Sequence, residues 1–341
     1  MRLNLIGNGF DMYHGLPCSY FYFACFLAEK YYDFYVEMAK MFGFRYGISR
    51  GYPFDDIDGV IIDDIFWKTF EERLGELDSL WLEESLQDDL GLEIDDPPVK
   101  LDIPEEANSR IINEKFCEWV INTVNTSENF KIIKENIGDN KLKLSKKDYY
   151  INFNYTQVLE EIYGIDSSRI NHIHGECYVH ESNDNVSLIV GHGNDESIEY
   201  IQAQIDELEK DEYYIFNQAL MNRMTEYETE LQILRDLRKN VSFLKSDMMR
   251  DINFKGIVPE EICVWGLSCG EVDRPYIEEL VKSFPKARWK FSYYSDDEKQ
   301  ERERFAHEVG IVDVDLFELK NPDDKYIREQ MVKINNIIIP D

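Results

Sequence analysis

The chain has 341 residues, with 37 Lys and Arg against 68 Asp and Glu, so its formal net charge is −31. Its length allows a large buried core and corresponds to one large domain or one domain with an insertion. The acidic balance argues against a protein that holds DNA or RNA through its overall field, because phosphate contacts need a basic surface. Nucleic acid is therefore an unfavoured partner, although a local basic groove stays compatible with these numbers.

The sequence shows neither a secretory leader nor a membrane span. The apolar run at residues 3–6 is too short for a signal peptide, and no apolar stretch approaches the roughly 20 residues that cross a bilayer. We therefore expect a cytoplasmic protein without a membrane partner. The six cysteines form no C-x-x-C pair, so in a reducing compartment we expect them to be free thiols.

The first motif of the chain follows a predicted strand at residues 2–6. This strand ends in Gly7-Asn8-Gly9-Phe10-Asp11, and a helical pattern of apolar and aromatic residues runs from Ser19 to about residue 42. A strand, then glycines, then a helix is how α/β proteins present backbone N–H groups to a phosphate. We therefore expect the pyrophosphate of a nucleotide to bind at Gly7, Asn8, Gly9 and Phe10.

The middle of the chain interrupts the sheet pattern. Residues 50–145 are interpreted as a helical insertion, with helices predicted over 63–81 and about 105–124. Strands are predicted over 149–154, 169–174 and 186–191, and the first of these ends in Phe153-Asn154-Tyr155-Thr156. The charged stretch 198–252 is interpreted as one or two long helices, serving as a solvated arm or as a dimer-forming face.

The C-terminal part alternates strands and helices regularly. Strands are predicted over 261–266, 289–294 and 312–316, with helices over 276–284 and 296–309 between them. This alternation predicts βαβ units and a mainly parallel, doubly wound, Rossmann-like sheet. The predicted core comprises 1–50 and 145–341 and includes the helical arm at 198–252.

Polar residues or glycines follow five of the predicted strands. In a right-handed doubly wound sheet the carboxyl ends of the strands meet at one crevice, where ligands bind. We therefore expect these groups to form one nucleotide pocket. The candidate binding residues are Gly7, Asn8, Gly9, Phe10, His14, Thr156, Gly191, His192, Gly266, Ser268 and Asp273, with Asn154 and His174-Gly175 at the same edge.

The combination of motifs along the chain resembles the bacteriophage abortive-infection family AbiH. The motifs are Gly-Asn-Gly-Phe-Asp with His-Gly-Leu-Pro, Trp67 with Phe70-Glu71, Phe-Asn-Tyr-Thr, His-Ile-His-Gly, Gly-His-Gly and Gly-Leu-Ser with Asp273. A more distant similarity is to sirtuins and sirtuin-like NAD-cleaving domains of bacterial immunity. Their Gly-Ala-Gly and Gly-Ile-Pro strings, strand-end Asn, His-Gly and Gly-x-Ser are similar to the motifs at 7–9, 15–17, Asn154, 174–175 and 266–268. Thr156 stands where sirtuins carry an Asp, and their paired-cysteine zinc ribbon is absent from this sequence.

The resemblance implies an anti-phage protein that binds NAD or a related nucleotide and hydrolyses the nicotinamide–ribose bond. It implies Asn154, His174 and Asp11 as catalytic residues, a phage-derived trigger and a homo-oligomer as partners, and no metal. The chemistry agrees with these residue types, because such a cleavage passes through an oxocarbenium-like state. An Asn can hold a ribose hydroxyl or order a water, and a His titrates in the range that suits a general base.

Two alternatives use the same residues. One is a nucleotide-sensing interaction protein without turnover, which acts through the helices at 198–252. The other is a metal-dependent hydrolase or nuclease, because His172, His174, Cys177 and His180 lie within nine positions, with His192 as a further ligand. His172 and His174 are predicted to project from one face of a strand.

Overall fold

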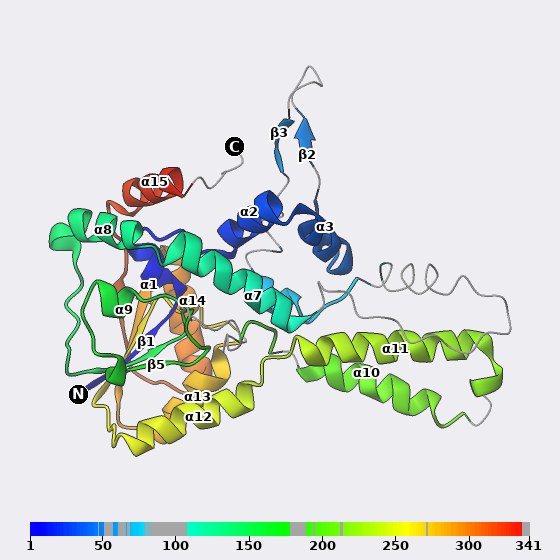
Figure 1. Ribbon diagram of the computed structural model, residues 1–341. Helices are drawn as coiled ribbons and strands as arrows, with labels where there is room; N and C mark the ends of the chain where they lie inside the picture. The colour runs from blue at the N-terminus through cyan, green and yellow to red at the C-terminus, as the bar shows by residue number, and fades with distance from the viewer. Residues whose placement is uncertain are drawn as a thin grey trace. The chain divides into compact units, whose positions relative to one another are not determined.

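The computed structural model describes residues 1–46, 48–50, 57–60, 66, 69–78, 81, 108–177, 189–193, 195–211, 214–270 and 272–335 (Figure 1). The chain divides into two compact units. The first comprises 1–22, 116–189 and 240–338, and the second comprises 23–115, 190–239 and 339–341. Segments far apart in the sequence thus build each unit.

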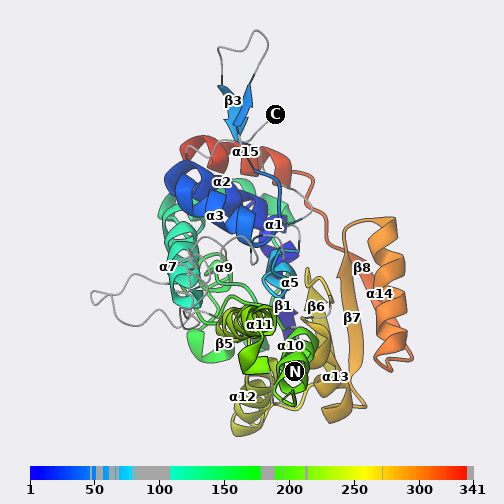
Figure 2. The ribbon, with the colours of Figure 1, turned by 90° about the vertical axis from the view of Figure 1, so that its right-hand side faces the viewer.

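The first unit is built on a six-stranded sheet in which every pair of neighbours is parallel. The strands are β1 (Arg2–Ile6), β4 (Tyr149–Asn152), β5 (Ile170–His172), β6 (Glu261–Trp265), β7 (Arg288–Tyr293) and β8 (Val314–Glu318). They lie in the order β5-β4-β1-β6-β7-β8. Figure 2 labels β5, β1, β6, β7 and β8 from left to right in this order. Renumbered within the sheet, this is the 3-2-1-4-5-6 order of the doubly wound fold. The predicted Rossmann-like α/β class is confirmed.

Six of the seven predicted strands belong to this sheet. The exception is the strand predicted over 186–191. Residues 186–188 lie outside the described residues, and residues 189–191 do not form a strand. The apolar run Ser-Leu-Ile-Val suggested this strand. Its last residue, Val190, is instead buried in the second unit, and the Val190 N–H donates to Asn113 Oδ1 at 3.1 Å.

Alternating side chains of the strands face one apolar core. Leu3 and Leu5 of β1, Tyr149 and Ile151 of β4, and Val264 of β6 are at most 1 % exposed and belong to a single cluster. Three helices contribute their apolar faces to the same cluster, namely α12 (Val241–Phe254), α13 (Arg274–Ser283) and α14 (Asp296–Glu308). Because the apolar residues of these strands are so completely buried, the sheet is rigid enough to position the loops at its ends.

Further helices of this unit are α1 (Asn8–Tyr13), α8 (Ser127–Asn136), α9 (Val158–Glu161) and α15 (Asp324–Ile334), with a π-helical turn η2 (Val120–Val124) and 3₁₀ turns η3 (Gly138–Asn140) and η4 (Ser167–Arg169). Helix α8 begins where Thr126 accepts a hydrogen bond from the N–H of Asn129 at 3.2 Å. Asn335, just after α15, donates to Asn129 Oδ1 at 3.0 Å and so ties the end of the described chain to α8.

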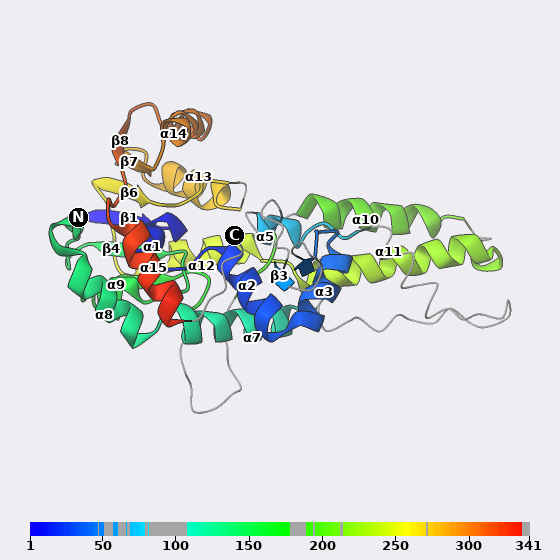
Figure 3. The ribbon, with the colours of Figure 1, turned by 90° about the horizontal axis from the view of Figure 1, so that it is seen from above.

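The second unit is mostly helical. Its elements include α3 (Tyr32–Met41), α5 (Phe70–Arg73), α10 (Asp195–Leu208), the 3₁₀ turn η5 (Tyr214–Phe216) and α11 (Gln218–Asp236), with an antiparallel hairpin of β2 (Ile48–Arg50) and β3 (Ile57–Val60). The remaining helices, α2 (Tyr20–Lys30) and α7 (Ser109–Trp119), each have residues in both units. Helices α10 and α11 lie side by side (Figure 3) and share a small core around Ile201, Ile205 and Leu234.

Two features differ from the sequence interpretation. Strand β3 of the hairpin lies within the segment expected to be helical, and β2 ends where that segment begins. The stretch 198–252 contains parts of three helices instead of one or two, and the third, α12, packs on the sheet through Leu244, Met248 and Ile252. An exposed arm was the wrong interpretation for α12, because its apolar residues recur at i, i+4 and i+8 and form one stripe.

Candidate functional site

The loops after β1 and β6 meet at the point where the strand order reverses. An ideal Cβ on Gly266 lies 2.2 Å from the nitrogen of Phe10, and one on Gly7 lies 2.4 Å from Leu267 Cα. Gly266 also has a φ of +61°, which favours glycine. The N–H of Gly9 donates to Gly266 O at 2.8 Å. The glycines therefore allow two loops to touch at the switch point, where dinucleotides bind in doubly wound sheets.

Three of the four amide groups predicted to hold a pyrophosphate donate hydrogen bonds within the protein. Besides Gly9, the N–H of Gly7 donates to Trp265 O at 2.9 Å and that of Phe10 donates to Gly7 O at 2.9 Å. Helix α1 that follows has six residues. The sequence pattern placed these glycines directly after the first strand, as observed, and the close approach of a neighbouring loop is a physical reason for them that does not involve a phosphate.

Asn154 links the ends of β4 and β1. Its Nδ2 donates to the carbonyl of Gly7 at 2.9 Å, and its backbone N–H donates to Asn152 Oδ1 at 3.1 Å. Both Asn side chains are buried. The structure therefore places Asn154 beside the first motif, 147 residues earlier in the chain, which the sequence interpretation predicted from the parallel sheet.

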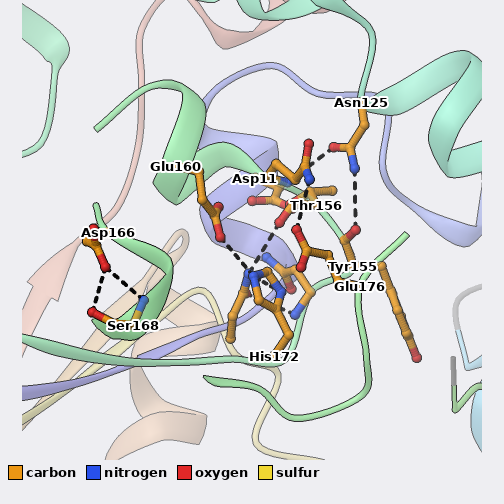
Figure 4. Close-up of polar contacts among 12 residues, drawn as sticks. Asp11, Asn125, Tyr155, Thr156, Glu160, Asp166, Ser168, His172 and Glu176 are labelled. Carbon is orange, nitrogen blue, oxygen red and sulfur yellow. Dashed lines mark hydrogen bonds and ion pairs between the residues drawn. The ribbon is translucent and has the colours of Figure 1, made fainter. Parts of the chain in front are cut away.

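Asp11 is the most strongly perturbed acid of this site. Its carboxyl group is buried and accepts a hydrogen bond from the hydroxyl of Thr156, and it also interacts with the Asn154 side chain. Burial raises the pKa of Asp11 to about 7, although these two hydrogen bonds oppose the shift. Asp11, Asn154 and Thr156 thus form one polar network (Figure 4, which labels Asp11 and Thr156), and its acid titrates near neutral pH.

His174 lies beside this network on an aromatic wall. Its Nδ1 is 3.2 Å from the carbonyl of Phe153, and its ring contacts the rings of Phe153, Tyr155 and Tyr276 at centroid distances of 5.6, 6.1 and 6.2 Å. A carbonyl oxygen only accepts, so Nδ1 carries the proton of the neutral ring and Nε2 carries the lone pair. Since Phe153 precedes Asn154 in the chain, the two predicted catalytic residues are held by one backbone segment.

The loop after β6 holds two more predicted residues together. Ser268 Oγ donates to Asp273 Oδ2 at 2.7 Å. The buried guanidinium of Arg302, from α14, donates to the carbonyl of Ser268. Between them, Cys269 is the one non-glycine residue with positive φ, at 59°, in the described part of the chain. Such strain persists only where the surroundings hold it, and it is frequent near functional sites.

His14 and the Gly191-His192 motif have different surroundings from those predicted. His14 is buried with Nδ1 2.7 Å from Phe10 O and Nε2 2.7 Å from the hydroxyl of Tyr163. Burial lowers its pKa to about 4, so it packs as a neutral ring. Gly191 and His192 belong to the second unit, where His192 N–H donates to Leu237 O at 3.0 Å. They are therefore not a strand end of the sheet.

A second polar group surrounds His172, and sequence reasoning missed its two acids, Glu160 and Glu176. His172 Nε2 lies 2.9 Å from Glu160 Oε1, and Glu176 accepts from Gln157 Nε2 at 2.8 Å (Figure 4). Burial by itself lowers the pKa of His172. The hydrogen bond to Glu160 and the negative charges of Glu160 and Glu176 raise it by more, so the net effect is an increase. The only sequence signal was an acid four residues after Thr156 and another two residues after His174.

Among the described residues, His172, His174 and Cys177 of the metal-ligand set proposed from sequence do not come together. Strand β5 ends at His172 and a turn follows, so His172 and His174 do not share a strand face. The thiol of Cys177 interacts with Cys117 instead, and burial raises its pKa. His180 lies outside the described residues, as does Trp67 of the resemblance.

Fold and site together define a Rossmann-like α/β protein with a buried polar network at the carboxyl ends of β1 and β4, next to the switch point of its sheet. The family model described as "Bacteriophage abortive infection AbiH" matches residues 3–293. The chain belongs to this family, and its role is anti-phage abortive infection. The match runs from β1 into β7 and includes every residue of the network.

The other comparisons add no relative. The search of curated proteins and the search of solved structures gave no match. Within the described residues, no helix combines the length and the apolar character needed to cross a bilayer.

Proposed function

We propose that this AbiH protein binds NAD or a related nucleotide at the switch point and hydrolyses its nicotinamide–ribose bond. The observation that carries the proposal is the network of Asp11, Asn154 and Thr156 at the carboxyl ends of β1 and β4. Ligands of doubly wound sheets bind at this position. A phage-derived component is the expected trigger, because an enzyme that depletes NAD must be inactive in a healthy cell.

The roles of the residues follow from their surroundings. Cleavage of the bond develops positive charge on the ribose, and the Asp11 carboxylate stabilises that charge when it is ionised. Asn154 orients a ribose hydroxyl or the attacking water. His174, with its lone pair on Nε2, accepts the proton of that water. In this way Asp11 supplies the carboxyl group that sirtuins place after their Asn, and the Thr156 hydroxyl donates a hydrogen bond to it.

The polar network also has a feature that fits a protein at rest. Asp11, Asn154 and Thr156 are 1 %, 6 % and 4 % exposed. Their hydrogen bonds connect the β1 and β4 loops to one another. A nucleotide that binds here must exchange some of these bonds for bonds to its ribose. This exchange is a physical route by which a trigger switches the enzyme on.

The test is the release of nicotinamide from NAD. Purified protein is incubated with NAD alone and with lysate of phage-infected cells, and free nicotinamide is followed by chromatography. Asn154→Ala and His174→Ala are each expected to lower the rate by about 100- to 10,000-fold and to abolish plaque reduction. Asn253→Ala and His307→Ala, at exposed positions, are the matched controls and should keep wild-type rates.

Three outcomes separate the candidate functions. Release that depends on Asn154 and His174 supports the NADase. Nucleotide binding by calorimetry, without release even from triggered protein, indicates the sensor that acts through partners. If both variants keep full release, plaque reduction and binding, the site is elsewhere in the protein. Thermal melts of every variant establish that a loss of activity is not a loss of fold.

A further inference from the structure

Asn152, the last residue of β4, connects the polar network to the histidine at the end of β5. It is buried, and its side chain contacts three groups. The amide Oδ1 accepts from the N–H of Asn154 at 3.1 Å. The amide Nδ2 lies 3.3 Å from the carbonyl oxygen of Thr156 and 3.4 Å from His172 Nδ1. Asn152 therefore contacts the backbone of both residues that bind the Asp11 carboxyl and, in addition, a titratable ring.

The chemistry of these partners fixes the orientation of the Asn152 amide. A backbone N–H only donates and a backbone carbonyl only accepts, so Oδ1 must face Asn154 and Nδ2 must face Thr156. His172 Nδ1 consequently meets a donor and accepts its hydrogen bond through the ring lone pair. The proton of the neutral ring then lies on Nε2, which donates to Glu160 Oε1 at 2.9 Å (Figure 4). The contacts therefore select one tautomer of His172.

A second proton on His172 does not fit this arrangement. A charged imidazole carries an N–H on both nitrogens, so its Nδ1–H would point at the NH₂ group of Asn152. The amide cannot turn its oxygen toward the ring without losing its hydrogen bonds to Asn154 and Thr156. Protonation of His172 and the observed position of the Asn152 amide therefore exclude each other.

Charged groups from three elements act on the His172 ring or respond to it. Burial lowers the pKa of His172, but the negative charges of Glu160 from α9 and Glu176 from the loop after β5 raise it by more, and a backbone interaction with Asn154 acts in the same direction. Burial raises the pKa of Asp11 from α1, and the charge of His172 lowers it. The surroundings thus favour a second proton on the ring, and only its contact with the amide of β4 opposes that proton.

We propose that Asn152 is a positioning residue of the site, and that protonation of His172 at Nδ1 displaces its amide from the loop after β4. The neutral ring accepts from the amide and so supports its contacts with Asn154 and Thr156. The charged ring repels the amide, and both loop residues lose a buried hydrogen bond. The inference deepens the NADase proposal and rests on it for turnover, whereas the contact of Asn152 with His172 is independent of any substrate.

The first experiment follows the histidine rings by NMR, without any ligand. The chain has six histidines, and His172→Gln identifies the His172 signals by their loss. Ring ¹⁵N shifts of the wild type at high pH should show the neutral proton of His172 on Nε2. In Asn152→Asp a carboxylate replaces the donor and accepts from Nδ1–H, so the proton affinity of His172 should rise at least about tenfold. Asn253→Asp adds the same charge at an exposed position and should leave it unchanged.

The second experiment measures the pH profile of nicotinamide release. In His172→Gln, the new amide offers an oxygen to Asn152 and an NH₂ group to Glu160, so it reproduces both contacts of the neutral ring but does not titrate. We expect the acid limb of log kcat against pH to become shallower by one proton in this variant. Asn253→Asp is again the matched control and should keep the wild-type slope.

Three results overturn the proposal. The first is a neutral His172 with its proton on Nδ1, and the second is an unchanged proton affinity of His172 in Asn152→Asp. The tautomer needs only wild-type protein, so it decides the question even if Asn152→Asp does not fold, which a thermal melt shows. The third is an unchanged slope in active His172→Gln, which removes the positioning role. If triggered wild-type protein releases no nicotinamide, the NADase proposal fails alone, because the NMR result does not depend on it.

Discussion

Each unit has an acid associated with a Gly-x-Gly motif, namely Asp11 in the first unit and Glu71 in the second. The side chains that contact these two acids differ. Asp11 is buried, and its hydrogen-bond partners Thr156 and Asn154 are neutral. Glu71 faces the ammonium of Lys239 at 3.0 Å, and the Lys239 side chain is 0 % exposed. The backbone N–H of Lys239 donates to His192 O at 2.7 Å, which joins this ion pair to the Gly191-His192-Gly193 motif.

The two acids differ in whether a cation compensates their charge. A buried carboxyl without a cation has a raised pKa and destabilises the fold when it ionises, and such groups concentrate at active sites. A buried carboxylate with a matched cation holds two segments together. Two glycine motifs that look equivalent in the sequence therefore lie near acids of two kinds, one with neutral hydrogen-bond partners and one in an ion pair.

The largest effect is expected for Asp11→Asn, which removes the charge from the polar network. If Asp11 stabilises the ribose cation, nicotinamide release falls by about 100- to 10,000-fold, equivalent to roughly 3–5 kcal/mol of barrier. The same variant should be more stable than the wild type at pH 8. An active variant of unchanged stability contradicts the assignment of Asp11.

The pH dependence of that gain in stability has a definite sign. The pKa of Asp11 is raised from 3.8 to about 7 in the folded protein, so the folded state holds a proton that the unfolded chain loses between these values. Stability therefore falls as the pH rises from about 4 to 7, by up to roughly 4 kcal/mol, and is constant above. Urea unfolding of wild type and Asp11→Asn at pH 5 and pH 8 measures this difference, and parallel curves would show that Asp11 is not responsible.

Glu71→Gln tests the other half of the comparison. It leaves the Lys239 ammonium inside the second unit without its carboxylate, and we expect a loss of about 3–5 kcal/mol in unfolding free energy. The matched control is Glu76→Gln, whose partner Arg73 lies at 2.5 Å in an exposed pair and which should cost less than about 1 kcal/mol. Equal losses for the two variants contradict a structural role for the buried pair. Urea unfolding measures both.

Gly266→Ala probes the contact of the two loops at the switch point. Alanine at this position must adopt the unfavourable φ of +61°, and its Cβ lies 2.2 Å from the Phe10 nitrogen. Backbone strain and overpacking together should lower the free energy of unfolding by about 2–5 kcal/mol. Gly256 has the same φ of +62° with nothing within 4 Å. Gly256→Ala should therefore show the backbone part alone, about 1–2 kcal/mol. The thermal and urea midpoints of the pair give the cost of crowding by difference.

The smallest effect is expected for Gly191→Ala in the second unit. A Cβ there lies 2.3 Å from the carbonyl oxygen of Leu237, and the overpacking should cost about 1–3 kcal/mol. Because this glycine attaches a loop and does not belong to the polar network, nicotinamide release of the folded variant should stay at the wild-type rate. A variant that folds normally but has lost its activity would assign Gly191 to the site after all.

Much of the fold could be predicted because each buried parallel strand appears in the sequence as a short apolar run, which is a local pattern. Buried runs such as 262–264 and 149–151, separated by helices, specify βαβ units without knowledge of any distant contact. At the described end of the strand predicted over 186–191, residues 189–191 form no strand, because a short apolar run also occurs where a single valine packs into a different core. Helix α12 was misassigned because a charged sequence can still carry one apolar stripe.

For the site, the sequence by itself determined that Gly7, Asp11, Asn154 and His174 lie at strand ends of one parallel sheet, since strand direction fixes which edge they share. Only the tertiary structure decided that Thr156 and Asn154 hold the Asp11 carboxyl in a buried place, that His14 is a packing residue, and that His172 faces Glu160 and Glu176. The physical reason is that a side chain's burial and hydrogen-bond partners can come from distant segments, as with Asp11 and Thr156, which are 145 residues apart. Periodicity encodes the direction of each segment, whereas the pKa of an acid depends on what the other segments bring against it.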